Sequence, residues 1–517
     1  MLGNENSPHP ASCRLNLWFA LAVALLFLLF CLTYLLRPIM EPDFFWHLKT
    51  GEWIWQHKQL PVFDPFSFTG PQTPDARQLV ILKGYWLAQL GYHTLVAACG
   101  LWGIFLLRII LLAAFFTLFL WMFARHQVNR LLALALLSLL VIFFLENYAL
   151  ERPQVFTFLA IGLLVICYRW GREHFQVDGS ISPPLVAAFT LVAVWSNLHG
   201  GVLLAQATLA VMACVELAVF ARGKDRQRFL RMLAFAGVAL AGSLLAPSQL
   251  GIGDFLSLLG LGQNSLSASQ SQTNYEYYSV FTWLIEIKNY KLLIPVALSL
   301  TSLLAVKEAV RRGHHLETVL LLVFWVFAYR NVRYLPIAMT FSLLFIAWNY
   351  RSDGLLRHAS IPLLIGAVLS FGLWTTNEFG HFARARAQGL VDPLNMPQQA
   401  ADFLQGQQFK GRILNPVNWG GYLMWRLGPE VQVAGDGRVL DVAAYEEVLN
   451  LFKGGAGVSG TPLWREYADR YQVNAALVPL MNGQRPSQMA QGMASDPDWR
   501  EVYRDQLSKI FVRRISL

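Results

Sequence analysis

The sequence predicts a mainly α-helical, polytopic transmembrane bundle of about eleven spans, followed by a soluble α/β domain at the C-terminus. Of the 517 residues, 55% are hydrophobic and only 14% are charged, whereas soluble domains carry roughly 25% charged residues. Apolar runs recur along the chain up to Trp374 and then stop. The tail beyond this point holds short apolar bursts that alternate with helical patterns, which is typical of a small α/β domain.

The first apolar run is about 22 residues long, which is sufficient to cross a hydrocarbon core of ~30 Å. No small-residue cleavage site follows it, so it predicts a retained signal anchor. The segment Tyr85–Leu101 is a further apolar helix that we expect to lie in the membrane interface. The expected spans are Leu15–Leu36, Gly103–Ala124, Leu131–Leu145, Val155–Ile166, Leu185–Trp195, Val202–Phe220, Leu230–Leu245, Leu292–Val306, Leu316–Ala328, Ile337–Trp348 and Ile361–Trp374.

Lysine and arginine residues fall in groups on alternate connections between these spans, which predicts that those connections are cytoplasmic. The N-terminus is then cytoplasmic, and a long first outer loop (residues 38–84) and the C-terminal tail lie on the outer face. The chain accordingly divides into a transmembrane domain, residues 1–375, and an extracytoplasmic domain, residues 376–517. The net charge is +9, but the basic residues fall between the expected spans and form no continuous basic surface. No nucleic-acid partner is therefore expected.

The first outer loop opens with 40-MEPDFFWHLKTGEW-53. Pro42 is suited to start a helix and Gly51 to stop it, and this helix would place Asp43 and His47 on one face, with its phenylalanines against the membrane surface. Asp43 falls in the first turn, where the helix dipole favours a carboxylate. Together with Glu41, this arrangement suits a general base or a metal ligand. The structural alternative is that Asp43 caps the helix and His47 is an interfacial side chain.

The second outer loop carries Glu146 at the end of one apolar run and Glu151-Arg152 at the start of the next. Ionisable side chains at this depth are costly and usually face a cavity or a partner. Either glutamate is therefore a candidate for a second carboxylate facing Asp43. The alternative is a local Glu151–Arg152 arrangement that marks the interface.

Further polar residues interrupt apolar sequence in 195-WSNLHGG-201, where Asn197 and His199 stand beside a glycine pair. Such residues line a cavity or pack against a neighbouring helix. Arg330 and Arg333 lie at the outer end of a span, against the positive-inside trend, and are candidates to hold a phosphate; snorkelling explains them equally. Glu276 lies among aromatic residues of the kind that stack on sugar rings, or that form an interfacial belt.

The tail completes no catalytic motif, which favours a structural cap or recognition domain. Within it, 418-NWGGY-422 suggests a tight turn that leads into a strand. The segment 436-DGR-438 suggests a turn that exposes two charges.

Taken together, these motifs resemble a large bacterial and archaeal group of multi-pass membrane proteins related to GT-C-fold glycosyltransferases. The resemblance covers most of the chain. The residues that carry it are 43-DFFWHLKTG-51, 61-PVFDPFSFT-69, Arg152-Pro153, Trp195–Gly201, 418-NWGGY-422 and 436-DGR-438.

The resemblance implies a GT-C-like fold and a polyprenyl-phosphate-linked sugar donor. It places Asp43 at the position of a carboxylate that is essential in the first outer loop of such enzymes, with Glu41 completing an acid-x-acid pair. Some members carry a second acid-x-acid pair, which is replaced here by Glu146-Asn147-Tyr148 and a separate Glu151. The resemblance therefore leaves open whether a divalent cation, Mg²⁺ or Mn²⁺, is bound. The sequon-reading motifs of oligosaccharyltransferases are absent, so N-glycosylation is not expected.

The leading functional hypothesis is an inverting hexosyl- or pentosyltransferase in the bacterial inner membrane. Asp43 would act as base toward a lipid, glycan or protein acceptor and be oriented by His47, while Arg330, Arg333 or Arg152 would bind the donor phosphate. Two other classes stay open. A transporter or flippase of lipid-linked sugar would have paired broken helices at mid-depth, and a non-catalytic scaffold would have Asp43 buried against Arg152.

Overall fold

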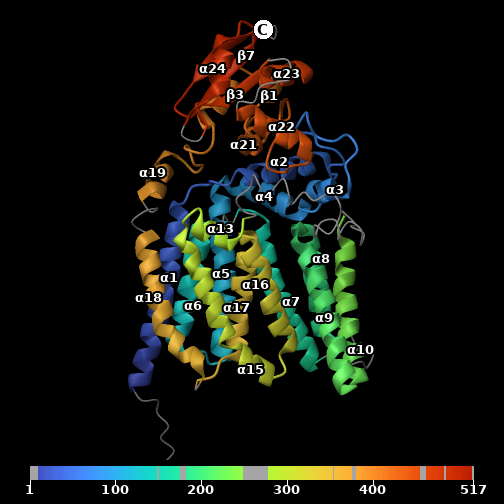
Figure 1. The fold of residues 1–517 in the computed structure, drawn as a ribbon, viewed down its shortest axis with the longest axis vertical. Coiled ribbons are helices and arrows are strands. Elements are labelled where there is room, and N and C mark those ends of the chain that lie inside the picture. The colour runs from blue at the N-terminus through green and yellow to red at the C-terminus, as the bar shows by residue number, and fades with distance from the viewer. Residues whose placement is uncertain are drawn as a thin grey trace, which may run out of the picture.

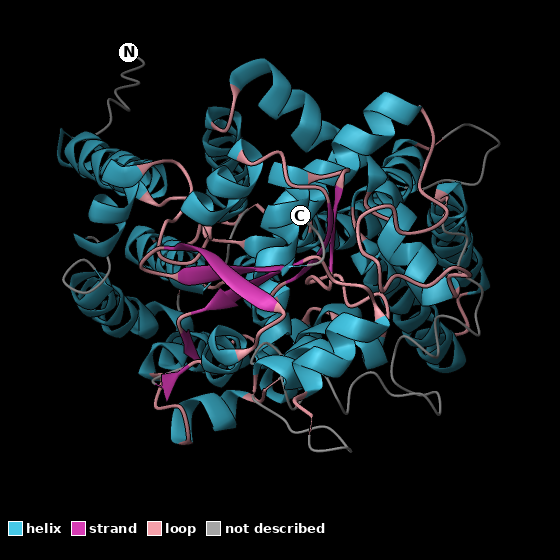
Figure 2. Ribbon diagram, turned by 90° about the horizontal axis from the view of Figure 1, so that it is seen from above, coloured by secondary structure: helices cyan, strands magenta, loops and turns pink. Residues whose placement is uncertain are grey.

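The computed structural model describes residues 10–147, 151–174, 182–247, 278–352, 354–374, 380–453, 461–482 and 485–514. A tall bundle of helices makes up most of the molecule, and a small α/β unit is mounted on one end of it (Figure 1). Seen along the bundle, the strands lie over the helices rather than beside them (Figure 2). This agrees with the mainly α fold class and the separate C-terminal sheet that the sequence predicts.

Each predicted span coincides with a helix or helical run in the described part of the chain. Six of these runs are long and apolar enough to cross a membrane by length and composition, and four further apolar helices are shorter. The bundle helices are α1 (Pro10–Leu36), α5 (Trp102–Arg125), α6 (Arg130–Asn147), α7 (Gln154–His174), α8 (Pro183–Leu198), α9 (Leu203–Gly223), α10 (Arg226–Gly242), α14 (Leu293–Leu303), α16 (His315–Arg330), α17 (Leu335–Asn349) and α18 (Ser360–Trp374).

Short helical turns extend or join these helices. They are η1 (Gly200–Val202), η2 (Ser243–Leu245), α13 (Val280–Ile285), η4 (Tyr290–Leu292), α15 (Val306–Arg311), η5 (Val332–Tyr334) and η6 (Leu355–Ala359).

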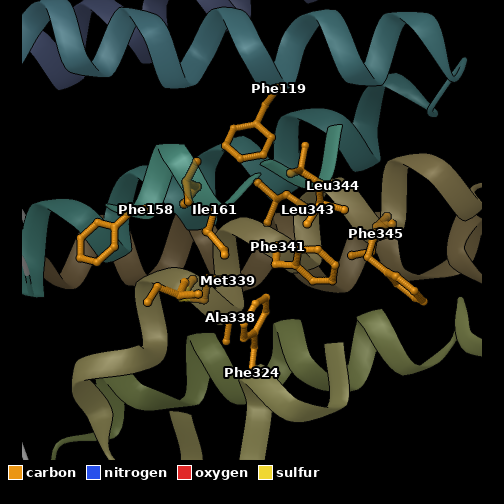
Figure 3. Packing of buried hydrophobic residues seen from close by; sticks show 14 of the residues in the cluster. Phe119, Phe158, Ile161, Phe324, Ala338, Met339, Phe341, Leu343, Leu344 and Phe345 are labelled. Carbon is orange, nitrogen blue, oxygen red and sulfur yellow. The ribbon is translucent and has the colours of Figure 1, made fainter. Parts of the chain in front are cut away.

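Helix α17 forms the centre of the bundle, since every one of its residues is buried. Phe341 and Leu344 of α17 pack among Phe119, Phe158 and Phe324, which come from α5, α7 and α16 (Figure 3). At Gly162 in α7, an added Cβ would lie 2.9 Å from Leu344 Cδ1. Inside a bilayer the hydrophobic effect does not drive helices together, because no water is displaced there. Close packing, assisted by small residues, holds them together instead.

A layer of three helices separates the bundle from the α/β unit: α2 (Pro42–His57), α3 (Ala76–Lys83) and α4 (Trp86–Cys99) (Figure 1). The expected start of α2 is confirmed, with Pro42 in the first turn and Glu41 as N-cap.

The expected stop of α2 at Gly51 is wrong, because the helix continues to His57. Gly51 serves close packing instead, since a Cβ there would overlap the carbonyl oxygen of Gln89 in α4. Phe44 and Phe45 of α2 are also not on the membrane surface. They are fully buried in a core shared with the C-terminal unit.

The α/β unit is built on a five-stranded sheet of order β2-β1-β3-β7-β6. Strand β1 pairs in parallel with β2 and β3, whereas β7 pairs antiparallel with β3 and β6. The strands are β1 (Gly411–Leu414), β2 (Val431–Val433), β3 (Ala475–Pro479), β6 (Trp499–Arg504) and β7 (Ser508–Arg513), with a separate hairpin of β4 (Met481–Asn482) and β5 (Arg485–Pro486). The unit's helices are α19 (Gly380–Gln388), α20 (Gln398–Gly406), α21 (Val417–Leu427), α22 (Val442–Phe452), α23 (Leu463–Arg470) and α24 (Gln488–Ser495).

Alternate residues along the strands face two different cores. Leu477 and Ile510 pack in the same cluster as Phe44 of α2, whereas Val478 and Phe511 pack with α22 to α24 on the other face. The period-two alternation of a strand explains this division. One face of the sheet is therefore completed by the first outer loop, and the C-terminal unit and that loop fold together.

Candidate functional site

The acidic residues that open α2 meet an arginine from the second outer loop. Arg152 Nε lies 3.0 Å from Glu41 Oε1, and its terminal nitrogen is paired with Asp43 Oδ2. The three side chains are 17% to 19% exposed. Glu41 also accepts a hydrogen bond from the backbone N–H of Asp43 (3.3 Å), so it caps the helix as well as pairing with Arg152. This pairing of Asp43 with Arg152 is the contact that the scaffold alternative predicts, although the carboxylate is only half-buried.

His47, one turn after Asp43, is directed away from this acidic pair. Its Nδ1 lies 3.4 Å from Gln89 Nε2 in α4, and its ring packs on Trp46 and against the edge of Tyr85. Burial lowers the pKa of His47 well below its ordinary value, and the Arg152 charge lowers it further. The contacts of His47 therefore join α2 to α4, and its ring is neutral at physiological pH.

Glu151, the neighbour of Arg152, is engaged elsewhere. Its carboxylate pairs with Arg108 of α5, and both side chains are almost completely buried. Arg108 also donates to the backbone carbonyl of Arg37 (2.9 Å), which ties the top of α5 to the end of α1. This pair was not predicted from the sequence. The single arginine in the apolar run 103–124 could have indicated it, because an ionisable side chain at membrane depth usually faces a partner. The side chain of Glu146 lies outside the described residues.

The break between α8 and α9 holds a chain of hydrogen bonds around His199. Trp195 Nε1 donates to Thr157 Oγ1 of α7 (2.9 Å), and that hydroxyl lies 2.7 Å from His199 Nδ1. The backbone N–H of Gly201 donates to the same nitrogen at 2.9 Å. Burial lowers the pKa of His199 to about 3, and the positive charges of Arg333 and Arg152 lower it further. Thr157 was not expected from the sequence to take part in the site.

Asn197 stabilises the arrangement of helices rather than facing the acidic pair. Its Oδ1 accepts a hydrogen bond from Trp86 Nε1 at 2.6 Å, and its Nδ2 donates to the carbonyl oxygen of Ala193 at 2.8 Å. These bonds hold the start of α4 over the end of α8.

Arg330 and Arg333 differ in their surroundings. Arg333 is half-buried in η5, and its charge lowers the pKa of His199. Arg330, by contrast, is exposed in the last turn of α16. Glu276 lies outside the described residues. The structure therefore gathers Glu41, Asp43, Arg152, His199 and Arg333 at one end of the bundle, from four separate connections.

Two sequence segments that are far apart in the chain form a buried ion cluster beside this site. Arg438 makes a bidentate pair with Asp64 (2.8 and 2.9 Å) and binds Asp436 with its Nε (2.7 Å). The side chains are 1% to 5% exposed. Burial alone would lower the pKa of Arg438, but the two carboxylates outweigh it and raise that pKa above its ordinary value. The expectation that the Asp-Gly-Arg turn exposes its charges is therefore wrong.

Backbone pairing adds to this attachment of the first outer loop. Phe68 N–H donates to the carbonyl of Val433 (3.2 Å), and Val433 N–H donates to that of Phe66 (3.0 Å), so the loop extends the sheet beyond β2. The segment Asn418–Tyr422 lies within helix α21 and not in a turn before a strand. At Gly421 of this helix an added Cβ would lie 2.7 Å from the Pro42 carbonyl oxygen, so α21 packs directly on the start of α2.

Gly437 brings the C-terminal unit into contact with Asp43. A Cβ at this position would overlap Asp43 Oδ1, while an added Cβ at Gly435 would meet only methyl groups of Val417 and Val448 at 3.8 Å. The tail thus supplies one wall of the acidic site. This contact gives a physical reason for glycine in the Asp-Gly-Arg segment.

We expect Gly437→Ala to displace the Asp43 carboxylate and to weaken its pair with Arg152, because no L side chain fits against it. Transfer activity of the kind proposed below should fall at least about 10-fold, in line with the cost of misplacing a reacting group. Gly435→Ala is the matched control and should retain activity. Equal activity of the two variants would show that Gly437 does not contact Asp43 in the working protein.

The acidic residues do not fit a bound divalent cation as they stand. Glu41 and Asp43 are both neutralised by Arg152, whereas a cation site requires carboxylate oxygens that are available to the ion. Over the described residues, no group of three or more His, Cys, Asp or Glu side chains could hold a metal ion.

Comparison with known proteins identifies the fold. No protein-family model and no curated protein sequence matches the chain. The structure of the oligosaccharyltransferase AglB from Archaeoglobus fulgidus, in complex with an inhibitory peptide and a dolichol-phosphate, aligns with a TM-score of 0.55 at 11% identity, over 90% of this chain and 69% of that one. An A. fulgidus oligosaccharyltransferase tethered to an acceptor peptide with the NVT sequon gives a TM-score of 0.51 at 12% identity, with the same coverage.

The fold is therefore shared with these oligosaccharyltransferase structures, which agrees with the GT-C-like fold that the resemblance in the sequence implies. Because identity is so low, the likeness establishes the architecture: an apolar helical bundle, a helical first outer loop and a C-terminal unit containing a sheet.

Proposed function

We propose that the protein is an integral-membrane glycosyltransferase, which moves a sugar from a polyprenyl-phosphate-linked donor to an acceptor on the extracytoplasmic face. The observation that carries this proposal is the convergence of Asp43 and Glu41 with Arg152, His199 and Arg333 beneath the C-terminal unit. The neighbouring fold supports it, since AglB was solved with a dolichol-phosphate. We place the protein in a bacterial inner membrane, with the N-terminus cytoplasmic and residues 376–517 outside.

In this proposal Asp43 is the general base of a single displacement that inverts the anomeric carbon. The acceptor oxygen attacks that carbon and its proton passes to Asp43, while the bond from carbon to the phosphate oxygen breaks and polyprenyl phosphate leaves. Arg333 and Arg152 offset the negative charge that develops on the phosphate. His47 holds α2 against α4 and does not contact the acceptor. Arg330 is exposed and is therefore the weaker candidate for phosphate binding.

An apolar cavity of about 420 Å³ gives the polyprenyl chain a place to bind. It is lined by α4, α5, α7 and α8, with Tyr92 and Leu107 among its residues. Two of its lining residues, Phe156 and Leu198, directly precede Thr157 and His199. A lipid bound there would hold its isoprenoid units at membrane depth and its phosphate near the polar residues.

The second candidate function is a non-catalytic scaffold with the same fold. The pairing of Asp43 and Glu41 with Arg152 favours it, because both carboxylates are engaged. For a transporter, by contrast, the polar residues of the site would be expected at mid-depth rather than at one end.

The deciding experiment is a transfer assay with purified protein in vesicles, supplied with a panel of radiolabelled polyprenyl-phosphate hexoses and pentoses. We expect release of polyprenyl phosphate from at least one donor, and none with vesicles that lack the protein. The absence of both donor binding and polyprenyl phosphate release, across the whole panel and with membrane extract added as acceptor, would overturn the enzyme in favour of a scaffold that has lost the donor site. Movement of intact donor across the bilayer would instead identify a transporter.

A further inference from the structure

The hydrogen-bond chain around His199 fixes which ring nitrogen carries the proton. A backbone N–H can only donate, so the bond from Gly201 requires Nδ1 of His199 to be an acceptor. Thr157 Oγ1 already accepts from the Trp195 indole, and its own hydrogen is therefore directed to the same Nδ1. A neutral imidazole with an accepting Nδ1 carries its hydrogen on Nε2.

Gly201 is required by this arrangement. An added Cβ would overlap Thr157 Oγ1 and would approach His199 Nδ1 to 2.5 Å. The glycine pair therefore does more than end α8, because its second member lets the backbone approach both side chains. The imidazole is therefore held by Thr157 of α7 and by the backbone N–H of Gly201.

The His199 ring lies within electrostatic reach of two arginines. Within the described residues, both hydrogen bonds recorded for the His199 ring are made by Nδ1, and the charges of Arg333 and Arg152 both act on the ring. An N–H donor beside two guanidinium groups is suited to an oxygen of an anion. His199 stays neutral in this setting, so it adds a directed hydrogen bond without a further buried charge.

We propose that His199 donates a hydrogen bond from Nε2 to a phosphate oxygen of the lipid donor, and that Thr157 is a positioning residue that, together with the backbone N–H of Gly201, holds the ring in the required tautomer. This inference rests on the proposed function and adds a neutral donor to its cationic phosphate site. Negative charge grows on the phosphate as the bond to the sugar breaks, so a preoriented donor stabilises the leaving group more than the starting state.

Two measurements on the full-length protein in detergent test the proposal. The first is ¹⁵N NMR of histidine-labelled protein, with the His199 signal assigned by its absence in His199→Phe. We expect the Nε2–H tautomer in the wild type and in Thr157→Ser. In Thr157→Val the Gly201 N–H still donates to Nδ1, so the same tautomer should persist, with a shifted Nδ1 resonance because one of its two hydrogen bonds is lost. An imidazolium or an Nδ1–H signal at neutral pH in the wild type would overturn the proposal.

The second measurement compares binding of undecaprenyl phosphate with binding of undecaprenol. Losing a hydrogen bond to a charged group should weaken binding of the phosphate about 10- to 100-fold in His199→Phe and less in Thr157→Val, with Thr157→Ser close to the wild type. Undecaprenol should bind all variants equally. Thr301→Val is the control, because among the residues that the structure describes that hydroxyl bonds only to Ala297 of its own helix, α14.

The outcomes separate this inference from the proposed function. If undecaprenyl phosphate binds the wild type and His199→Phe equally, His199 is not a phosphate ligand, while the proposed function is untouched. If the wild type does not prefer undecaprenyl phosphate to undecaprenol, the polyprenyl-phosphate donor itself is refuted, and this inference is refuted with it.

Discussion

Asp43→Asn should reduce sugar transfer about 10²- to 10⁴-fold, the range that a general base contributes. The amide keeps the size of the side chain and an oxygen that can accept from Arg152, but it cannot take the proton of an acceptor hydroxyl. Transfer is measured as release of polyprenyl phosphate by purified variants at equal concentration. Binding of the donor should change little, since Arg333, Arg152 and His199 remain.

The matched control is Asp75→Asn, also in the first outer loop. Asp75 caps α3 through a reciprocal pair of hydrogen bonds with Gln78, so its loss affects a helix end without touching the site. We expect this variant to retain transfer activity and most of its stability, because asparagine caps a helix about as well as aspartate. If Asp43→Asn and Asp75→Asn transferred sugar equally well, Asp43 would have no part in the chemistry.

A further variant separates the enzyme from the scaffold. Arg152→Met leaves Glu41 and Asp43 as a close pair of unneutralised carboxylates, which should destabilise this end of the bundle in either case. In the enzyme it should also weaken binding of undecaprenyl phosphate, whereas in a scaffold the loss would be confined to stability.

The elements that depend on local pattern were predictable from the sequence. Apolar runs of suitable length gave the bundle helices, because a membrane requires backbone groups to be satisfied within each segment. Helix α20 and strands β3 and β7 in the tail also follow their local patterns. The start of α2 was predictable as well, since Pro42 and Glu41 act within a single turn.

The parts that could not be predicted depend on contacts between distant residues. Gly51 is a plausible helix stop by its own properties, and only the carbonyl of Gln89 explains why it lies inside α2. Arg438 and Asp64 are separated by 374 positions, and nothing local indicates that they pair. The acidic residues were correctly singled out as unusual, but their partners, Arg152 for Asp43 and Arg108 for Glu151, come from other elements.

Arg438→Met should cost about 3–5 kcal/mol, the usual effect of removing one partner from a buried ion cluster. It would leave Asp64 and Asp436 as two carboxylates without their cation in an almost dry environment. We expect a lower thermal unfolding midpoint in detergent and faster proteolysis of the loop between α2 and α3. Transfer should fall too, because Gly437, the neighbour of Arg438, contacts Asp43.

Two comparisons make this prediction specific to the buried cluster. Lys410→Met removes an ion pair with Glu430 in which both side chains are more than half exposed, and such pairs contribute only about 0–1 kcal/mol. Adding Asp64→Asn and Asp436→Asn to Arg438→Met removes the stranded charges and should recover part of the loss. If Arg438→Met unfolded at the same temperature as Lys410→Met, the cluster could not be what fastens the first outer loop to the C-terminal unit. The positioning of Asp43 would then depend on the shared apolar core and on the backbone pairing of the loop with β2.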